Sequence, residues 1–411
     1  MFKICLFDLD QTLIRTDDLK EIREAGKRID SPEYRTAVTK AFLQETNRQI
    51  YGPVLLLKIR AQFPELKLVV FTRSPRSYAR VVLELAYPGF EWDLLVAYED
   101  VKHTKPYGDG IDAAMHKFEI TMLDQVLLVG DSDSDVRSAY HAGCMVTLDK
   151  GKWPDKRGNE HWNALGHIPD AIITEPEELL DVLANANGYL PELERLLVDA
   201  PRQGIPRFER INHFIPRSIG GTTTPFPIYV SGRSFAGYES LKWRRKWHLL
   251  TAAIKDQKDA EIFPDEWVEA VFTFIKSELP FVKFAGHLTI TAIPHRPGRK
   301  PRLQTFINQL AVSEHALKFR KNALSFVPDI LAYKDGVRSN SNDHLGRDDR
   351  FINVRDHLFV QYPESVTSQV LVLDDVTTTG STLIYAKKYL ELAGARSVTC
   401  LSLAKNISEV L

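Results

Sequence analysis

Short apolar runs in the first half of this sequence end directly in acidic, hydroxyl or glycine residues, and helix-like segments separate the runs. The runs and the residues that follow them are Ile4–Phe7 with Asp8, Lys67–Phe71 with Thr72, and Gln125–Val129 with Gly130 and Asp131. Alternating strands and helices are typical of a parallel sheet with helices on both faces. The polar residues would then meet at the carboxyl edge of the sheet, where ligands bind in such folds. The sequence therefore predicts a doubly wound α/β domain.

The chain has 411 residues, which is enough for two or three domains. Between Asp199 and Phe226, prolines and glycines crowd a stretch without sustained periodicity, which indicates a linker. Further strands are expected at Ile228–Val230, Leu288–Ala292 and Val370–Leu373. We predict a first domain over residues 1–195, a linker over 196–225 and a second doubly wound α/β domain over 226–411.

The composition narrows the range of partners. The chain carries 53 Lys and Arg against 54 Asp and Glu, so no field of one sign would hold nucleic acid along its surface. No apolar run approaches the roughly 18 residues that span a bilayer, and the first residues lack a signal-peptide pattern. Cys5, Cys144 and Cys400 lie far apart, which argues against a disulfide framework and a thiolate zinc site. We expect a soluble, cytoplasmic protein without nucleic-acid or membrane partners; whether it forms a homo-oligomer stays open.

Asp8 and Asp10 lie one residue apart in the turn after the first apolar run. Two carboxylates in such a turn can hold a hard divalent cation such as Mg²⁺. They can also divide the roles of nucleophile and general acid/base, as covalent catalysis requires.

The first half contains four motifs in the order that the haloacid dehalogenase superfamily uses. They are Asp8-Leu9-Asp10-Gln11-Thr12, Thr72, Lys105-Pro106 and Gly130-Asp131-Ser132-Asp133-Ser134-Asp135. The chain resembles that superfamily over roughly residues 1–190. The resemblance implies a Rossmann-like fold and a catalytic set in which Asp8 is the phosphorylated nucleophile and Asp10 the general acid/base.

The same resemblance implies that Thr72 and Lys105 bind the transferring phosphoryl group. It also implies a Mg²⁺ cofactor held by Asp8 and Asp10, with Asp131 completing the coordination and Asp135 in support. Because it has an aspartate at position 10, the chain resembles the phosphatases of the superfamily and not the dehalogenases.

The segment between the first motif and the next strand predicts a small helical cap over about residues 15–51. A helix is expected near Glu33–Gln49, opened by Ser31 and Pro32. Caps exclude water and select the substrate. Because a small cap leaves the site open, either a bulky substrate or a neighbouring domain would complete its wall.

A second polar turn follows the expected strand Val370–Leu373. Asp374 and Asp375 stand at the end of this strand, and a helix is expected after the turn, over Leu383–Leu392. The turn consists of Thr377, Thr378, Thr379, Gly380, Ser381 and Thr382. Backbone N–H groups at a helix N-terminus attract phosphate, and hydroxyl groups add donors. The adjacent acids suit ribose hydroxyls or a bound Mg²⁺. A GxxxxGK[ST] lysine is absent, which excludes a nucleoside triphosphatase loop.

This turn closely resembles the phosphoribosyl diphosphate signature of type I phosphoribosyltransferases. The resemblance implies a phosphoribosyltransferase-type fold, in which Asp374 and Asp375 contact the ribose hydroxyls and Thr377–Thr382 cradle the 5′-phosphate of phosphoribosyl diphosphate. Thr378 stands where purine-salvage members generally carry an aspartate, which argues against hypoxanthine or guanine salvage.

Further matches over residues 226–408 resemble the competence-protein-F-like branch of that family. Ile293–Arg296 stands at the position of its diphosphate loop, and Arg350–Val354 resembles its R-x-x-N-V pattern. Arg296 and Arg299 would meet diphosphate oxygens, because guanidinium suits bidentate contacts. That branch commonly begins with a cysteine-rich zinc module, which a dehalogenase-like domain replaces here, so a role in DNA uptake does not transfer.

Together the two halves predict a bifunctional enzyme. One domain would hydrolyse a phosphorylated small molecule with Mg²⁺, and the other would transfer phosphoribose from phosphoribosyl diphosphate, as successive steps that make a ribosylated metabolite. Two alternatives stay open: the second domain senses a phosphoribosyl ligand and regulates the phosphatase, or the protein acts on nucleic-acid ends through a docking domain.

The basic and aromatic stretch Lys242–Trp247 could suit a nucleic-acid surface. We instead expect it to begin a helix that continues into Ile254. Trp243 and Trp247, four residues apart, would bury one face of that helix.

Overall fold

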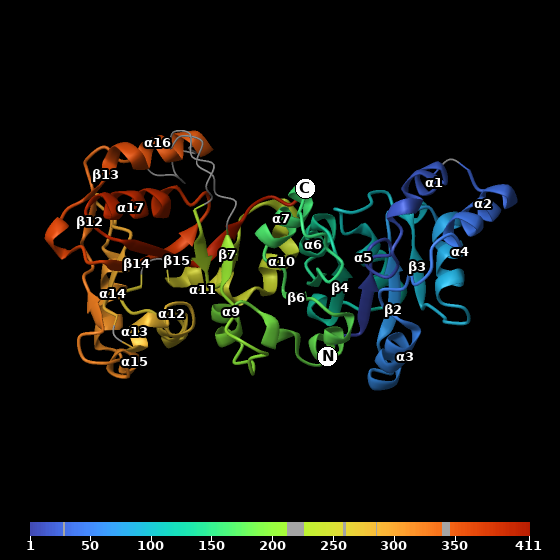
Figure 1. The fold of residues 1–411 in the computed structure, drawn as a ribbon, viewed down its shortest axis with the longest axis horizontal. Helices are drawn as coiled ribbons and strands as arrows, with labels where there is room; N and C mark the ends of the chain where they lie inside the picture. Colours follow the sequence, from blue (N-terminus) through green and yellow to red (C-terminus); the bar gives the residue numbers. More distant parts are fainter. Residues whose placement is uncertain (28, 212–225, 258–259, 285, 339–345) are drawn as a thin grey trace. The chain divides into compact units, whose positions relative to one another are not determined.

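The computed structural model describes residues 1–27, 29–211, 226–257, 260–284, 286–338 and 346–411. The chain forms two compact units. The first contains Met1–Tyr189, Ala236–Trp247 and Ser408–Leu411, and the second contains Leu190–Phe235 and His248–Ile407. Each unit is built on a sheet with helices around it (Figure 1), in agreement with the α/β prediction. None of the helices in the described residues combines the length and apolar character that crossing a membrane requires.

The first unit has a six-stranded parallel sheet in the order β3-β2-β1-β4-β5-β6. Its strands are β1 (Ile4–Phe7), β2 (Lys67–Phe71), β3 (Leu94–Val96), β4 (Val126–Gly130), β5 (Met145–Asp149) and β6 (Ala171–Ile173). All residues of β1 and β4 are buried, as expected for strands that helices cover on both faces. Since β1 lies between β2 and β4, the predicted motifs at their ends come from three neighbouring strands.

Outside the cap, the helices of this unit include α3 (Pro53–Gln62), α4 (Arg76–Ala86), α5 (Asp109–Lys117), α6 (Asp133–Ala142), α7 (Asn159–Gly166) and α8 (Leu179–Asn185). Helix α6 ends at Ala142 and is capped by Gly143, where φ is +92°. Glycine is favoured at such a left-handed helix end.

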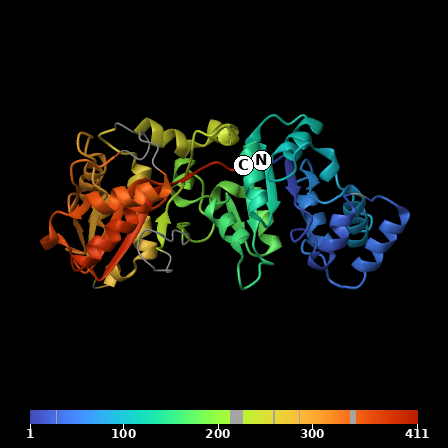
Figure 2. The same ribbon diagram turned by 90° about the horizontal axis from the view of Figure 1, so that it is seen from above.

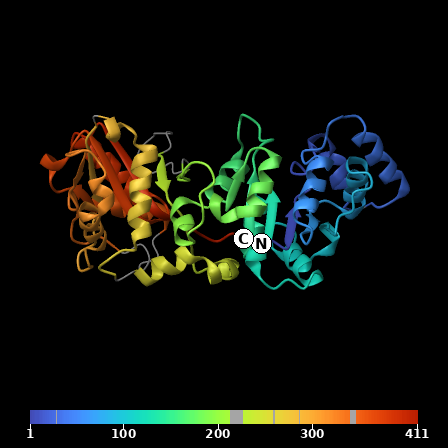
Figure 3. The ribbon, with the colours of Figure 1, turned by 90° about the horizontal axis from the view of Figure 1, so that it is seen from below.

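The cap consists of a 3₁₀ turn at Asp17–Leu19, helix α1 (Lys20–Ala25) and helix α2 (Pro32–Phe42). In Figures 2 and 3 these helices, in blue, form a cluster at one end of the unit. The Ser31 side chain accepts from the Tyr34 N–H, so the predicted opening of α2 is confirmed. The helix ends at Phe42, before the predicted Gln49. Arg48 Nε donates to the Phe42 carbonyl at 2.7 Å and so occupies the acceptor that a further helical turn would use.

The second unit has a seven-stranded sheet in the order β11-β10-β14-β15-β8-β7, with β9 also paired to β15. The strands are β7 (Glu209–Ile211), β8 (Ile228–Val230), β9 (Arg233–Phe235), β10 (Leu288–Ala292), β11 (Leu324–Phe326), β14 (Gln369–Thr377) and β15 (Ser397–Ile407). All pairs are parallel except β7 with β8. A separate antiparallel pair is formed by β12 (Leu331–Tyr333) and β13 (Leu358–Val360).

Helices cover both faces of this second sheet. Helix α17 (Ser381–Leu392) lies on one face, and α12 (Asp265–Glu278) and α14 (Arg302–Val312) lie on the other (Figures 1 and 3). The remaining helices of the unit are α9 (Glu192–Leu197), α11 (Leu249–Asp256), α13 (Phe281–Phe284), α15 (Glu314–Leu317) and α16 (Arg347–His357). The unit thus has its own apolar core, centred on α12, β10 and β14.

The predicted domain boundaries need correction. Residues 190–195 belong to the second unit, and β7, inside the predicted linker 196–225, pairs with β8 in the second sheet. The last part of that linker, residues 212–225, lies outside the described residues. Residues 236–247 and 408–411 belong to the first unit, although the prediction assigned them to the second domain.

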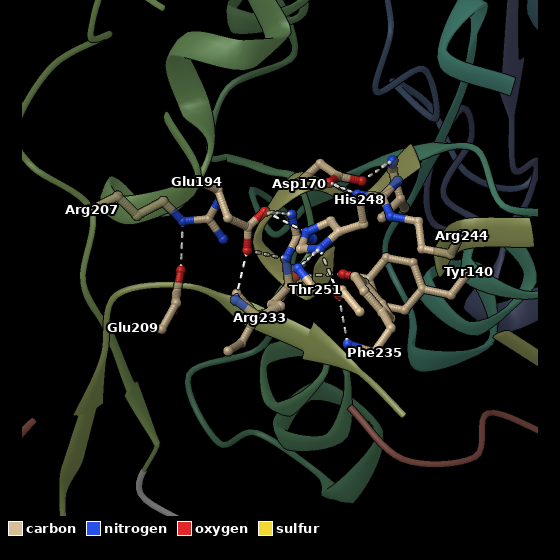
Figure 4. A network of polar contacts seen from close by, with 12 residues as sticks. Tyr140, Asp170, Glu194, Arg207, Glu209, Arg233, Phe235, Arg244, His248 and Thr251 are labelled. Carbon is tan, nitrogen blue, oxygen red and sulfur yellow. Dashed lines mark hydrogen bonds and ion pairs between the residues drawn. The ribbon is translucent and has the colours of Figure 1, made fainter. Parts of the chain in front are cut away.

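A buried ion network explains why residues 190–195 join the second unit. Glu194 on α9 accepts from Arg233 Nε at 2.9 Å and contacts His248 Nε2 at 3.0 Å (Figure 4). All three side chains are almost completely buried. Because Arg233 and the His248 ring compensate the carboxylate, the pKa of Glu194 is lowered despite its burial. Buried charges require partners of this kind, so the network fixes α9 within the second unit.

Arg244 similarly joins residues 236–247 to the first unit. It lies on α10 (Lys242–Trp247) with an exposed fraction of 0%, forms an ion pair with buried Asp170 (Figure 4), and donates to the Cys144 carbonyl at 2.8 Å. The prediction for this helix was wrong in two respects. Trp243 is 42% exposed, and the helix ends at Trp247 because His248 adopts an extended conformation and caps α11. The face of α10 that carries Arg244 is buried instead, because buried Asp170 requires a counter-charge.

Candidate active site

Asp8 follows β1 directly, and the Asp8 N–H donates to the Val129 carbonyl on β4 at 2.9 Å. Lys105 reaches the same place from the loop before α5. Its Nζ donates to Asp8 Oδ1 at 2.7 Å and to Asp135 Oδ1 at 2.6 Å, and its side chain is only 1% exposed. One buried ammonium group therefore bridges the predicted nucleophile and a carboxylate at the start of α6.

Three carboxylates surround this position. Asp8, Asp131 and Asp135 each offer an oxygen, and these oxygens lie within 4.8 Å of one another. Oxygen donors at this spacing suit a hard divalent cation such as Mg²⁺. A Cβ on Gly130 would lie 2.2 Å from Asp135 Cγ, so glycine at the end of β4 is what lets Asp135 approach the strand ends.

The charges in this cluster are not balanced by the protein alone. Burial raises the pKa of Asp8 to about 6, although Lys105 acts in the opposite direction, and the carboxylates of Asp135 and Asp10 raise it further. Burial also raises the pKa of Asp131 well above its usual range, again assisted by Asp135 and Asp8. Burial opposes the charge of Lys105, but the two carboxylates outweigh it and the lysine pKa is raised. A divalent cation would relieve the remaining repulsion, so the residues present fit one.

The Asp10 carboxylate is held apart from this cluster. Its Oδ1 accepts from Thr16 Oγ1 at 2.6 Å and from the Tyr78 hydroxyl at 3.2 Å, and its Oδ2 accepts from Ser74 Oγ. Arg23 Nη1 lies 3.0 Å from the same Oδ1. Of the four predicted metal ligands, the structure thus gathers the side chains of Asp8, Asp131 and Asp135 and leaves that of Asp10 in a separate network of hydroxyl groups.

Thr72 is buried after β2, and its hydroxyl oxygen accepts from the Ser74 N–H at 3.0 Å. It lines the same cavity as Lys105, so all four predicted catalytic residues face one space. The cavity has a volume of about 520 Å³. Its lining includes Asp8, Asp10, Thr72 and Asp131 from the strand ends, Lys105 from the loop before α5, and Lys20, Arg23 and Lys27 from the cap.

The sequence analysis did not identify the cap cations or the hydroxyl groups around Asp10. A signal for the cations was present, because Lys20, Arg23 and Lys27 are spaced three and four residues apart and so share one helical face. Tyr78 and Ser74 carried no such signal, since their side chains meet Asp10 only through folding.

Comparison with known proteins bears on the first unit. Residues 20–148 match the model of the haloacid dehalogenase-like hydrolase family. The first unit is a haloacid dehalogenase-like hydrolase domain. The pyrophosphatase PpaX of Bacillus mycoides is 23% identical over 219 residues, which are 44% of this chain and 97% of that protein.

Two solved structures are similar to part of this chain. One is described as a predicted phosphoglycolate phosphatase from Haemophilus somnus, with 20% identity, 44% of this chain and 97% of that chain covered, and a TM-score of 0.32. The other is a haloacid dehalogenase superfamily hydrolase of subfamily IA from Geobacter sulfurreducens, with 17% identity, 44% and 100% covered, and a TM-score of 0.32.

The second predicted site lies in the other unit, where β10 and β14 are parallel neighbours with Ala292 opposite Leu373. The loops that follow these strands therefore start side by side. Strand β14 continues to Thr377, beyond the predicted end at Leu373, because its pairing with β15 continues through Asp374 and Thr377. Gly380, with φ of +73°, lies directly before α17. A left-handed conformation of this kind favours glycine.

One of the two predicted ribose-binding residues, Asp375, contacts an arginine that was not predicted from the sequence. Arg302 Nη1 at the start of α14 donates to Asp375 Oδ2 at 2.6 Å. Burial raises the pKa of Asp374 well above its usual range, the charge of Asp375 raises it further, and Arg296 lowers it. Arg296 and Asp374 also act on the pKa of Tyr333, which burial raises to about 12.

The remaining predicted residues lie along the same loops. Ser381 is buried, and the Thr379 hydroxyl donates to Ser381 Oγ at 3.2 Å. The Thr382 side chain forms a hydrogen bond with the Tyr333 hydroxyl. The Thr378 side chain is exposed. Arg299 is exposed in the loop after β10, and its N–H donates to the Arg296 carbonyl at 3.0 Å. Of the two arginines of this loop, Arg296 thus interacts electrostatically with Asp374.

Proposed function

We propose that the hydrolase domain cleaves phosphomonoesters of small molecules through an aspartyl-phosphate intermediate. The observation that carries this proposal is the placement of the Asp8 carboxylate at the end of β1, 2.7 Å from Lys105 and within one cluster with Asp131 and Asp135. Phosphoryl transfer depends mainly on positioning and on positive charge against the phosphoryl oxygens, and this arrangement supplies both.

In the first step an Asp8 oxygen forms a bond to phosphorus while the bond from phosphorus to the ester oxygen breaks. Asp10 gives a proton to the departing oxygen, which leaves as an alcohol. In the second step Asp10 takes a proton from a water molecule, whose oxygen bonds to phosphorus as the Asp8–phosphorus bond breaks. Lys105 balances charge on the phosphoryl oxygens, and Thr72 offers its hydroxyl to them. The products are the alcohol, orthophosphate and the original carboxylate.

Asp8, Asp131 and Asp135 would hold Mg²⁺, which when bound supplies further positive charge against the phosphoryl group. The raised pKa values of Asp8 and Asp131 support this assignment. A nucleophilic carboxylate has to be ionised near neutral pH, and a bound cation would favour the ionised form of both carboxyl groups. Asp10 was also predicted as a ligand, but the hydroxyl and guanidinium contacts of its carboxylate favour the acid/base role.

The test is orthophosphate release from a panel of phosphomonoesters in the presence of Mg²⁺. Inorganic pyrophosphate, a phosphoanhydride, is tested beside the panel because PpaX proteins are named pyrophosphatases. Asp8→Asn should reduce release at least about a thousandfold, because it removes the nucleophile. Asp30→Asn, at an exposed cap position, is the matched control and should retain full activity. Equal activity of the Asp8→Asn variant and the unchanged protein would refute the mechanism.

We further propose that the second unit binds phosphoribosyl diphosphate and transfers its phosphoribosyl group to a small acceptor. The neighbouring loops after β10 and β14 support this proposal, because one carries Arg296 and Arg299 and the other carries Asp374 and Asp375. Gly380 and the hydroxyl groups before α17 would receive the 5′-phosphate. Diphosphate release that depends on an added acceptor is the measurement that tests it.

The two activities would act in sequence, so that the hydrolase domain removes the phosphate from the ribosylated product. Mass spectrometry of a metabolite extract incubated with Mg²⁺, phosphoribosyl diphosphate and the Asp8→Asn variant should show a phosphorylated intermediate that the unchanged protein consumes. If diphosphate is released with none of the acceptors tested, the second unit is a ligand sensor. A steep salt dependence of DNA or RNA binding would instead favour the nucleic-acid alternative.

A further inference from the structure

The cap side of the hydrolase cavity is rich in cations. Lys20 and Arg23 on α1 and Lys27 just after it line the cavity, and Arg73 adds a fourth cation from the loop after β2. Two acids, Asp17 and Glu24, line the cap side as well. Lys27 is paired with Glu24 at 2.7 Å. The cap wall thus has an excess of positive charge, whereas the strand ends carry the aspartates.

Arg23 is the cap cation closest to the proposed chemistry. Its side chain is 20% exposed, and Nη1 lies 3.0 Å from Asp10 Oδ1. Asp10 accepts from the hydroxyl groups of Thr16, Ser74 and Tyr78 as well. The carboxylate would therefore keep three donors if Arg23 turned toward a substrate. Since a guanidinium has five N–H donors, it can contact Asp10 and a further anion together.

The position of Arg23 fixes which part of a substrate it can reach. A general acid has to lie within hydrogen-bond distance of the oxygen that it protonates, so the leaving oxygen lies next to Asp10. The atoms one to three bonds beyond that oxygen then fall beside Arg23, which contacts the same carboxylate. A neutral substituent there would leave the cap cations without an added partner, whereas an anionic group would gain charge-assisted hydrogen bonds.

We infer that the hydrolase domain selects phosphomonoesters whose leaving group carries a second anionic group, a carboxylate or a phosphate, close to the leaving oxygen, and that Arg23 determines this selectivity. The inference rests on the proposed phosphatase function and specifies its substrate class.

Matched substrates separate charge from size. Glycerol 2-phosphate and 2-phosphoglycerate differ only in that one CH₂OH group becomes a carboxylate. 2-Hydroxyethyl phosphate and ethylene glycol bisphosphate make the corresponding comparison for a second phosphate. The quantity to measure is the ratio of kcat/KM for the anionic member to that for the neutral member of each pair.

Arg23→Gln removes the charge but keeps an amide that can still donate to Asp10. The unchanged protein should favour the anionic member by about 10- to 100-fold in at least one pair, as charge-assisted hydrogen bonds imply, and Arg23→Gln should remove most of that preference. The pair that shows the preference identifies the anion as carboxylate or phosphate. Arg35→Gln on α2, where an exposed arginine pairs with Asp30, is the matched control and should keep the ratio. Urea unfolding midpoints establish that both variants are folded.

Each other outcome overturns a defined statement. A ratio near one in the unchanged protein, or equal losses on both members of a pair in Arg23→Gln, would overturn the inference while leaving the phosphatase function intact. Equal losses would mean that Arg23 acts through Asp10 alone. If none of the substrates releases orthophosphate and the unchanged protein behaves as Asp8→Asn does, the phosphatase function fails and the inference fails with it.

Discussion

The carboxylate cluster at the end of β1 should destabilise the hydrolase domain when no metal is bound. Burial is the main reason that the pKa of Asp8 rises from 3.8 to about 6, and Lys105 only partly offsets it. Because the folded state holds this proton more tightly than the unfolded chain, ionising Asp8 costs folding free energy. The cost begins as the pH rises past about 3.8 and is complete above about 6.

The size of this effect follows from the pKa difference. The difference between a pKa of 3.8 and one of about 6 corresponds to roughly 3 kcal/mol, which is an upper value because the Asp8 side chain is 15% exposed. Asp8→Asn removes the ionisable group and so should stabilise the metal-free domain by about 1–3 kcal/mol at pH 7.5, although it abolishes phosphatase turnover. A domain of this size would then unfold several degrees higher.

The assay is calorimetric unfolding of both proteins in EDTA at pH 7.5 and at pH 4. The stabilisation should appear at pH 7.5 and nearly vanish at pH 4, where Asp8 is largely protonated in the folded state. Added Mg²⁺ should stabilise the unchanged protein more than the variant, which reduces the difference. Asp30→Asn, in the exposed cap, should change stability by less than about 0.5 kcal/mol. A variant that unfolds at a lower temperature in EDTA at pH 7.5 would refute the reasoning.

Three further predictions concern other parts of the chain. Arg244→Met should destabilise the hydrolase domain by about 3–5 kcal/mol in urea unfolding, because it leaves Asp170 buried without its counter-charge, and adding Asp170→Asn should recover part of the loss. Glu194→Gln should destabilise the second unit at pH 7 and by a smaller amount near pH 3, because a carboxyl with a lowered pKa contributes stability that is lost progressively as the pH falls below its unfolded-state value of 4.5, and chemical unfolding at the two pH values checks this. Asp375→Asn should reduce diphosphate release at least about tenfold and leave orthophosphate release unchanged, since it removes only a ligand of the second site.

The elements that the sequence predicted well are those that local patterns determine. The bounds of strand β2 match the prediction, because a short apolar run between polar residues is typical of a buried strand in a parallel sheet. The gathering of Asp8, Lys105 and Asp131 also followed from local information, since each comes directly after a strand or lies in the loop beside one.

The features that sequence reasoning missed depend on contacts between distant segments. The hydrogen bonds of Asp10 join residues as far apart as Thr16 and Tyr78, and no pattern along the chain indicates them. The burial of Arg244 likewise follows from Asp170, which lies 74 positions earlier, so helical periodicity favoured the neighbouring tryptophan instead. Residues 236–247 were placed in the wrong unit for the same reason.

The interrupted course of the chain bears on how the protein is made. Residues 236–247 and 408–411 belong to the hydrolase domain, and Arg137 on α6 donates to the carbonyl of Val410 at 2.6 Å. A ribosome releases the N-terminal part of a polypeptide first, and domains usually fold as they emerge. Here α6 acquires all its neighbours only after residues 408–411, which follow the core of the second unit in the chain, have been translated. Nascent chains that stall early would therefore carry a complete set of phosphatase motifs on an unfinished scaffold.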